Sequence, residues 1–231
     1  MTEPKTVRAG LDMARRALEE AAARPARGEP VPLDDDTTTD DVARMVQETA
    51  EARRQQRWEL VCPRRFRGAS LEWVLAEHGH VVYEQLTAWA TAAERVNLVL
   101  LGPVGTGKTS AALAACKADQ LDHGAGVAFH PVAELLDLLR PGGPDDSMAR
   151  LTAAPRLIVD DVGTERVTDW TAERMSVLIN RRWMEELPTI ATSNLQPKEL
   201  CEAMGERAYS RLVGGALVIE LSGKDRRRNR G

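Results

Sequence analysis

Residues 97–109 read NLVLLGPVGTGKT, and this stretch decides the fold class. It joins a short apolar run, typical of a strand buried on both faces, to the phosphate-binding pattern GxxxxGK plus Ser or Thr, which ends in Lys108 and Thr109. The pattern binds phosphate where a strand precedes it and a helix follows it, and the sequence predicts both here. The alternative, a chance match in a glycine-rich turn, does not account for that context. We therefore expect a nucleotide-binding α/β domain.

The loop itself predicts a set of phosphate contacts. Its glycines allow successive backbone N–H groups to point at one anion, and the following helix adds the positive end of its dipole. Lys108 is expected to reach the β- and γ-phosphates, and the Thr109 hydroxyl is expected to bind Mg²⁺. The predicted nucleotide-binding residues of the loop are Gly102, Pro103, Val104, Gly105, Thr106, Gly107, Lys108, Thr109 and Ser110.

Two further apolar runs end in polar side chains. Residues 157–161, LIVDD, end in Asp160 and Asp161. Carboxylates at the carboxyl end of such a strand lie beside the phosphate loop, so Asp160 is expected to hold Mg²⁺ and Asp161 to orient or deprotonate the attacking water. Asn194 follows the run 189–192 and lies near the γ-phosphate if that strand lies between the other two. The alternative for Asn194 is an ordinary turn residue.

The rest of the sequence alternates between apolar runs and helical patterns. Most of the runs are separated by helical stretches of ten or more residues, which predicts a five-stranded parallel α/β sheet. Three tryptophans, Trp73, Trp89 and Trp183, lie at helical spacing with apolar residues and are expected to pack in the core or at helix edges. The expected strands are residues 97–101, 126–130, 156–160, 189–192 and 217–221.

The N-terminal part differs in composition, because no Phe, Tyr, Trp or Ile precedes Trp58. A core is hard to build without these residues, so we predict a helical and flexible region over 1–57 and a nucleotide-binding domain over 58–231. Within the first region the pattern predicts an amphipathic helix over 7–23 and an extended linker over 24–41. A second helix is expected to follow, capped by Thr39 or Asp40.

Composition and charge exclude several classes of protein. The chain has 231 residues, 43% of them hydrophobic, which is enough for one core and too many for a disordered chain. It carries 35 acidic against 31 basic residues, so any binding of nucleic acid must be local. The three cysteines show no CxxC spacing, which excludes a disulfide framework and a four-ligand zinc site and fits a reducing, cytoplasmic location. No apolar run approaches the roughly 20 residues that a bilayer requires.

These motifs, in this order, resemble those of AAA+ ATPases, and in particular the DnaC/IstB group of helicase loaders and transposition helper ATPases. The likeness covers about residues 62–228. It implies an αβα sandwich of the AAA+ P-loop type, with ATP as the nucleotide bound between neighbouring subunits. The blocks that carry it are CPRRFRGASL at 62–71, GPVGTGKT at 102–109, DDVGTE at 160–165, TSNL at 192–195 and GERAYSRL at 205–212.

The resemblance also implies roles for residues outside the loop. Arg211, supported by Arg207, is expected to be the arginine finger that completes the site of a neighbour. Arg227 matches the arginine that contacts phosphate within its own chain, with the neighbouring arginines as alternatives. Phe66 lies where the group lines its adenine pocket.

Two positions match single-stranded DNA contacts of related loaders, namely Thr168 and Trp170. The alternative is that Trp170 anchors the start of a helix that is capped by Asp169. Asp161 departs from the usual AAA+ glutamate and is one methylene shorter, which predicts slow hydrolysis. Glu165 is a substitute base by position but is expected to face solvent or a neighbour.

The sequence therefore predicts an ATP-dependent loader that places a hexameric replicative helicase on single-stranded DNA and self-associates through shared ATP sites. Region 1–57 is expected to hold the helicase, unless it folds back on its own ATPase domain. One alternative is a transposition helper that binds duplex DNA and recruits a transposase. Another is a nucleotide-binding adaptor with little hydrolysis. A small-molecule kinase is disfavoured, because nothing between Arg140 and Ala154 supplies an arginine-rich lid.

Overall fold

The structure, a computed structural model, describes residues 39–123, 126–164 and 168–223. The chain divides into two units, Met1–Gln55 and Gln56–Gly231. The predicted helix over 7–23 lies outside the described residues. The predicted linker is too long at its end, because helix α2 (Thr39–Val61) already begins at Thr39. Asp40 and Asp41 in its first turn favour an earlier start, since carboxylates stabilise the positive end of a helix dipole.

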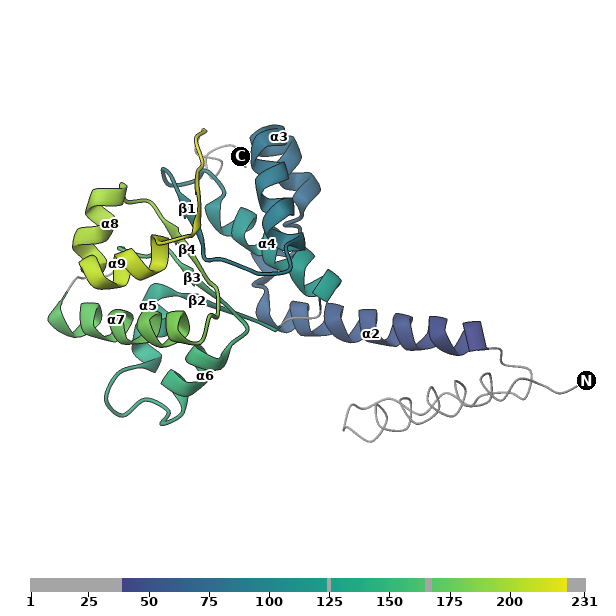
Figure 1. The fold of residues 1–231 in the computed structure, drawn as a ribbon, viewed down its shortest axis with the longest axis horizontal. Helices are drawn as coiled ribbons and strands as arrows, with labels where there is room; N and C mark the ends of the chain where they lie inside the picture. The colour runs from purple at the N-terminus through teal and green to yellow at the C-terminus, as the bar shows by residue number, and fades with distance from the viewer. Residues whose placement is uncertain (1–38, 124–125, 165–167, 224–231) are drawn as a thin grey trace, which may run out of the picture. The chain divides into compact units, whose positions relative to one another are not determined.

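Five parallel strands form one sheet in the order β2–β3–β4–β1–β5 (Figure 1). The predicted five-stranded parallel sheet is confirmed, and each strand lies within one residue of its expected bounds. The order places β4 between β1, which leads into the phosphate loop, and β3, which ends in the paired carboxylates. The strands are β1 (Leu98–Leu101), β2 (Val127–Pro131), β3 (Arg156–Asp160), β4 (Thr189–Ser193) and β5 (Leu217–Glu220).

Alternate residues of each strand face opposite sides of the sheet, and both sides are covered by helices (Figure 1). Leu98 and Leu100 of β1 pack into the core on the side of α3 and α4, whereas Val99 and Leu101 pack on the side of α5 to α9. The predicted αβα sandwich is therefore confirmed. The helices are α3 (Leu71–Thr91), α4 (Lys108–His123), α5 (Val132–Leu138), α6 (Ser147–Ala153), α7 (Asp169–Met184), α8 (Pro197–Met204) and α9 (Glu206–Val213).

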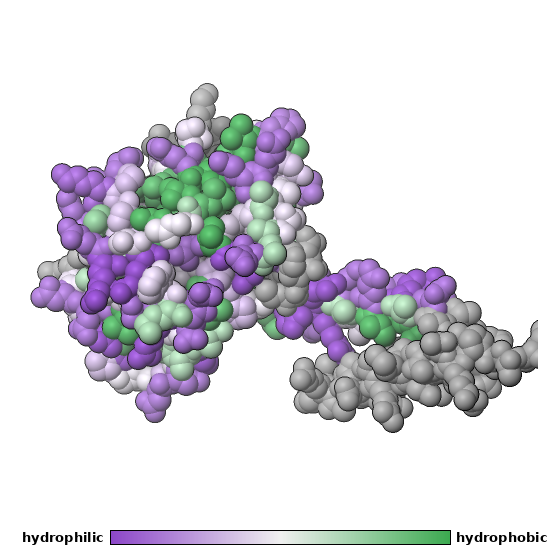
Figure 2. All heavy atoms as spheres, viewed as in Figure 1, coloured by the Kyte–Doolittle hydropathy of each residue, from purple (hydrophilic) through white to green (hydrophobic). Residues whose placement is uncertain are grey.

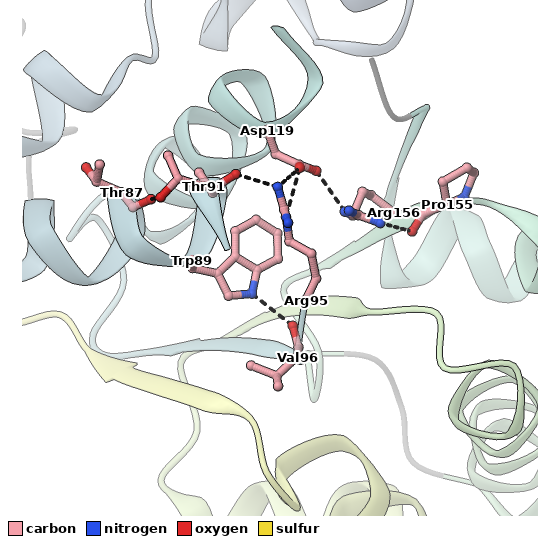
Figure 3. Close-up of polar contacts among 9 residues, drawn as sticks. Thr87, Trp89, Thr91, Arg95, Val96, Asp119, Pro155 and Arg156 are labelled. Atoms are coloured by element: carbon pink, nitrogen blue, oxygen red, sulfur yellow. Dashed lines mark hydrogen bonds and ion pairs between the residues drawn. The ribbon is translucent and has the colours of Figure 1, made fainter. Parts of the chain in front are cut away.

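A buried charge cluster joins the helix of the phosphate loop to the sheet (Figure 3). Asp119 of α4 is fully buried and accepts hydrogen bonds from Nε of Arg95 at 2.8 Å and from Nε of Arg156 at 2.7 Å. Arg95 precedes β1, and Arg156 is the first residue of β3. Because one carboxylate satisfies two guanidinium groups, the cluster fixes α4 against the amino ends of two strands.

Asn97 connects three elements at the same edge of the sheet. Its Nδ2 donates to the carbonyl oxygens of Arg211 and Leu212 in α9, at 3.1 and 2.9 Å. Its Oδ1 accepts a 2.8 Å hydrogen bond from the backbone N–H of Thr189, the first residue of β4. Asn97 therefore holds the last turn of α9 at the amino ends of β1 and β4.

The surface gives one further observation on the fold. Figure 2 shows hydrophobic residues gathered on the face of the molecule where β1 and β5 lie. Within the described residues, β5 pairs only with β1, and Val218 at its centre is partly exposed.

None of the helices in the described ranges is long and apolar enough to cross a membrane.

Candidate nucleotide-binding site

The turn after β1 takes a backbone form that requires glycine. Gly102, Gly105 and Gly107 have φ angles of 139°, 83° and 92°, in the left-handed region that other residues rarely adopt. A Cβ on Gly102 would lie 2.1 Å from the carbonyl oxygen of Leu221, directly after β5. The loop can therefore curl tightly against the neighbouring strand only with glycine at this position.

Lys108 is held over this loop. Its side chain is buried, and Nζ donates hydrogen bonds to the carbonyl oxygens of Gly102 and Pro103, both at 2.9 Å. The buried hydroxyl of Thr106 also donates to the Pro103 carbonyl at 2.9 Å. These bonds hold an ammonium group beside the glycine-rich turn, where a phosphate would be attracted to it.

Asp160 lies at the meeting point of three elements. Its Oδ1 accepts hydrogen bonds from Oγ1 of Thr109 in α4 at 2.8 Å and from Oγ1 of Thr192 in β4 at 2.7 Å. Burial raises the pKa of Asp160, while the two hydroxyl donors oppose this shift; the charge of Asp161 adds to it and that of Lys108 opposes it. The structure thus brings together the hydroxyl and the carboxylate that were predicted to hold Mg²⁺.

The donor set at this position fits Mg²⁺. Within the described residues Oδ2 of Asp160 accepts no hydrogen bond, because both hydroxyl donors bind Oδ1. No group of three or more His, Cys, Asp or Glu residues in the described ranges could enclose a metal ion. Mg²⁺ in nucleotide sites is commonly held by one or two side-chain oxygens together with phosphate oxygens and water. Thr109 and Asp160 match that sparse requirement.

The backbone turns at Asp161, directly after the end of β3. Its φ of 59° is in the left-handed region, which Asp tolerates better than most residues. The backbone N–H of Asp161 donates to Oγ1 of Thr192 at 2.9 Å, and its carbonyl accepts from Oγ1 of Thr164 at 2.7 Å. These bonds fix the turn, and Asp161 lines the cavity above the phosphate loop.

Asn194 reaches the same cavity from β4. The condition for its predicted position is met, since β4 lies between β1 and β3. Its Oδ1 is buried and has no hydrogen-bond partner within the described residues. The preceding Ser193 fixes the turn, because its Oγ donates to the Val162 carbonyl at 2.6 Å and accepts from the Leu195 N–H at 3.1 Å. The amide therefore offers an unused acceptor to a bound ligand.

A cavity of about 810 Å³ lies over the phosphate loop, and Lys108, Thr109, Asp161 and Asn194 line it, whereas Asp160 does not. Phe66, which was expected at the adenine pocket, is in the short 3₁₀ helix Arg64–Phe66 and lines this cavity. Sequence reasoning missed Trp73 and Glu77, which line the cavity from one side of α3. Their spacing of four residues was the available signal, since it places both side chains on one helix face. The full lining is Arg65, Phe66, Gly68, Ala69, Trp73, Glu77, Val104, Gly105, Gly107, Lys108, Thr109, Ser110, Asp161, Thr164 and Asn194.

The two arginines of the block at 205–212 do not line this cavity. Arg207 is exposed in the first turn of α9. The carbonyl of Arg211 is bound by Asn97, which precedes β1, whereas the phosphate loop follows the other end of β1. Arg211 is therefore at the amino ends of the strands, whereas the cavity of its own chain lies at their carboxyl ends. Arg227 and Glu165 lie outside the described residues.

Thr168 and Trp170 lie at a second cavity, of about 620 Å³. Thr168, with an extended backbone, is the N-cap of α7 and accepts a hydrogen bond from the Thr171 N–H at 3.2 Å. The expectation that Asp169 caps this helix is wrong, because Asp169 is already its first residue. Trp170 is half-buried and packs against the core on the side of the sheet that α5 to α9 cover. It also lines the cavity. The remaining lining is Ala133, Leu136, Asp137, Arg140, Pro141 and Thr171.

The fold and the cavity over the phosphate loop define a P-loop ATPase of the AAA+ class. The pattern of the family described as IstB-like ATP binding protein matches residues 75–229. The replicative helicase loader DnaI of Bacillus subtilis (strain 168) is 27% identical over 169 residues, which are 66% of this chain and 54% of that protein. An ATP-binding protein of insertion sequence IS21 from Pseudomonas aeruginosa is 30% identical over 155 residues, which are 63% of this chain and 58% of that protein.

A crystal structure of DnaI has a similar fold, with a TM-score of 0.64 and 23% identity, covering 74% of this chain and 99% of that chain. Because the family pattern matches more than half of the sequence, the chain belongs to the IstB-like ATP binding proteins. The resemblance to the DnaC/IstB group and the binding of ATP are confirmed. The chain spans little more than half the length of the two relatives DnaI and the IS21 protein.

Proposed function

We propose that this protein is an ATP-dependent loader that places a hexameric replicative DNA helicase on single-stranded DNA. The observation that carries the proposal is the position of Arg211. It lies at the amino ends of the strands, opposite to the cavity of its own chain at their carboxyl ends. A cation placed there suits the nucleotide of a second copy, so ATP would control assembly. The similarity to the loader DnaI over 66% of the chain favours a helicase as the cargo.

Residues of one chain would bind and position the nucleotide. Lys108 would exchange its bonds to the loop carbonyls for the β- and γ-phosphates. Thr109 and Asp160 would hold Mg²⁺, which neutralises charge on the phosphates when bound. Asp161 would orient the attacking water and accept its proton, and the free oxygen of Asn194 would accept a hydrogen bond from that water.

Residues of a neighbouring copy would complete the reaction. Arg211, with Arg207 in support, would offset the negative charge that develops on the transferred phosphoryl group. Arg227 would contact phosphate in its own chain. Thr168 and Trp170 would contact single-stranded DNA; the half-exposed position of Trp170 at a cavity supports this role, because an aromatic ring there can stack on a base.

A transposition helper is the second candidate, and the 30% identity to the IS21 protein favours it. It would bind duplex DNA and recruit a transposase. The nucleotide-binding adaptor rests on Asp161, whose carboxylate is one methylene shorter than that of glutamate. The same substitution predicts slow hydrolysis in a loader.

Turnover of ATP by two variants tests the shared site. Lys108→Ala should abolish nucleotide binding, because it removes the cation over the phosphate loop. Arg211→Ala should preserve binding and reduce turnover by about 10³-fold or more, as expected for an arginine finger. Arg181→Ala, an exposed arginine of α7, is the matched control and should change neither. Normal turnover by Arg211→Ala would contradict a shared site.

Capture of a partner separates loader from helper. Full-length protein with ATP should bind the purified replicative helicase of its host, and single-stranded DNA should stimulate turnover more than duplex DNA. A chain that begins at residue 56 should lose the helicase if the N-terminal region holds it. Binding of a transposase, together with a preference for duplex DNA, would instead establish the helper.

A further inference from the structure

The guanidinium of Arg211 lies over the indole ring of Trp183. Cζ of Arg211 is 5.4 Å from the ring centroid, within the range of a cation–π interaction. Trp183 is in the last turn of α7 and is 54% exposed, although its spacing predicted packing in the core or at a helix edge. Within the described residues, Trp183 belongs to neither of the two core clusters, and its ring contacts the guanidinium of Arg211.

The ring is held by a rigid backbone. Arg182, the preceding residue, is fully buried. Its guanidinium donates to the carbonyl oxygens of Leu151 at 2.8 Å and Pro188 at 2.7 Å, and to Oγ1 of Thr189 at 3.0 Å. These bonds anchor the end of α7 to α6 and to the start of β4. The backbone that carries Trp183 is therefore anchored next to Arg211.

Arg211 is held on its backbone side as well. Nδ2 of Asn97 binds the carbonyl oxygens of Arg211 and Leu212, which fixes the last turn of α9. Within the described residues no carboxylate forms an ion pair with Arg211, whereas other arginines of the chain pair with aspartates. An aromatic ring holds a guanidinium by its flat face and leaves its N–H groups free to bind an anion.

We propose that Trp183 is a positioning residue that holds Arg211 ready for the nucleotide of a second copy of this chain. The proposal rests on the arginine-finger role given to Arg211 under the proposed function. Without the ring, the long side chain of Arg211 would sample many conformations, and only a fraction of them would reach a neighbouring phosphate. Trp183 acts through Arg211 and does not itself contact the nucleotide.

Complementation between two inactive variants tests this role in the full-length protein. Lys108→Ala cannot use ATP but still supplies Arg211, whereas Arg211→Ala binds ATP but supplies no finger. A mixture of the two should recover turnover. Trp183→Leu added to the Lys108→Ala chain should lower the recovered kcat about two- to five-fold, as expected from the strength of an exposed cation–π contact, and leave KM for ATP unchanged.

Matched changes separate positioning from damage to the fold. Trp183→Leu added instead to the Arg211→Ala chain should leave the recovered turnover unchanged, because no finger remains there to be held. Trp183→Phe in the Lys108→Ala chain should restore part of the loss, and Met184→Leu, the next exposed residue, should have no effect. Equal losses from Trp183→Leu in either chain, or no loss in the Lys108→Ala chain, would overturn the positioning role alone. No recovery in the parent mixture would overturn the shared site and the positioning role together.

Discussion

Oγ1 of Thr109 donates a 2.8 Å hydrogen bond to Oδ1 of Asp160, which joins the first turn of α4 to the last residue of β3. Oγ1 of Thr192 donates to the same oxygen at 2.7 Å, so the two hydroxyl groups together fix the orientation of the Asp160 carboxylate. Its second oxygen remains available to a cation. Hydrogen bonds thus arrange the two residues that we propose hold Mg²⁺ before any ligand enters.

Asp160→Asn should preserve the fold and strongly reduce Mg²⁺-dependent turnover. The amide can still accept the two hydroxyl hydrogen bonds, but it lacks the charge that attracts the cation. We expect a loss of about 100-fold or more in turnover, measured as a function of Mg²⁺ concentration. Asp145→Asn, an exposed carboxylate, is the control and should behave as the unaltered protein. Full activity of Asp160→Asn would contradict the assignment of this metal ligand.

The raised pKa of Asp160 predicts a pH dependence of Mg²⁺ binding. Burial favours the neutral carboxyl, so the group takes up a proton at a higher pH than an ordinary Asp, whose pKa is 3.8. As pH falls through the raised pKa, the Mg²⁺ concentration required for half-maximal turnover should increase. A profile governed by the ordinary value of 3.8 would show that the ionised carboxylate is not destabilised in the site.

The raised pKa of Asp160 affects stability in the opposite direction: rising pH favours Mg²⁺ binding but lowers the contribution of Asp160 to the free energy of unfolding. The folded chain holds the proton of Asp160 more tightly than the unfolded chain does, so its contribution to the free energy of unfolding is fully present below pH 3.8. This contribution is lost as pH rises through the raised folded pKa. The free energy of unfolding can be measured by urea denaturation at several pH values. As pH rises above 3.8, it should therefore fall less in Asp160→Asn than in the unaltered protein.

Asp119→Asn should destabilise the ATPase domain. It leaves the guanidinium groups of Arg95 and Arg156 largely buried without their carboxylate. We expect the free energy of unfolding to fall by about 3–5 kcal/mol, the usual effect of removing one partner of a buried ion pair. Asp137→Asn removes a carboxylate from an exposed pair with Arg140 and should change stability by less than about 0.5 kcal/mol. Similar losses in both variants would mean that burial of the cluster is unimportant.

Gly102→Ala should disrupt the phosphate loop beyond the cost of its backbone angle. The new Cβ would meet the Leu221 carbonyl at 2.1 Å, so the loop and the residue after β5 must separate. Gly142 also has a positive φ, of 87°, but a Cβ there would meet nothing within 4 Å. Gly142→Ala should cost about 1–2 kcal/mol from strain alone and preserve nucleotide binding. Titration with a fluorescent ATP analogue should show lost binding only for Gly102→Ala.

The candidate site was predictable where one short segment carries the information. The loop at 102–109 was found because its glycines and Lys108 are consecutive in sequence. Trp73 and Glu77 were missed, because a four-residue spacing on a helix suits packing as well as a cavity. The exposed position of Trp183 was missed for the same reason. In each case the neighbouring element, rather than the local pattern, decides which way the side chain faces.

The strands and the helix of the phosphate loop follow from the amino-acid sequence alone, because apolar runs, glycine positions and helix periodicity act over a few residues. The tertiary structure decided which strand ends meet. Only the strand order β3–β4–β1 brings Thr192 to Asp160 and Asn194 to the cavity that Asp161 lines. Only the packing of α9 puts Arg211 at the amino ends of the strands, away from that cavity. Strand order and helix packing depend on the joint burial of distant segments, which no local pattern encodes.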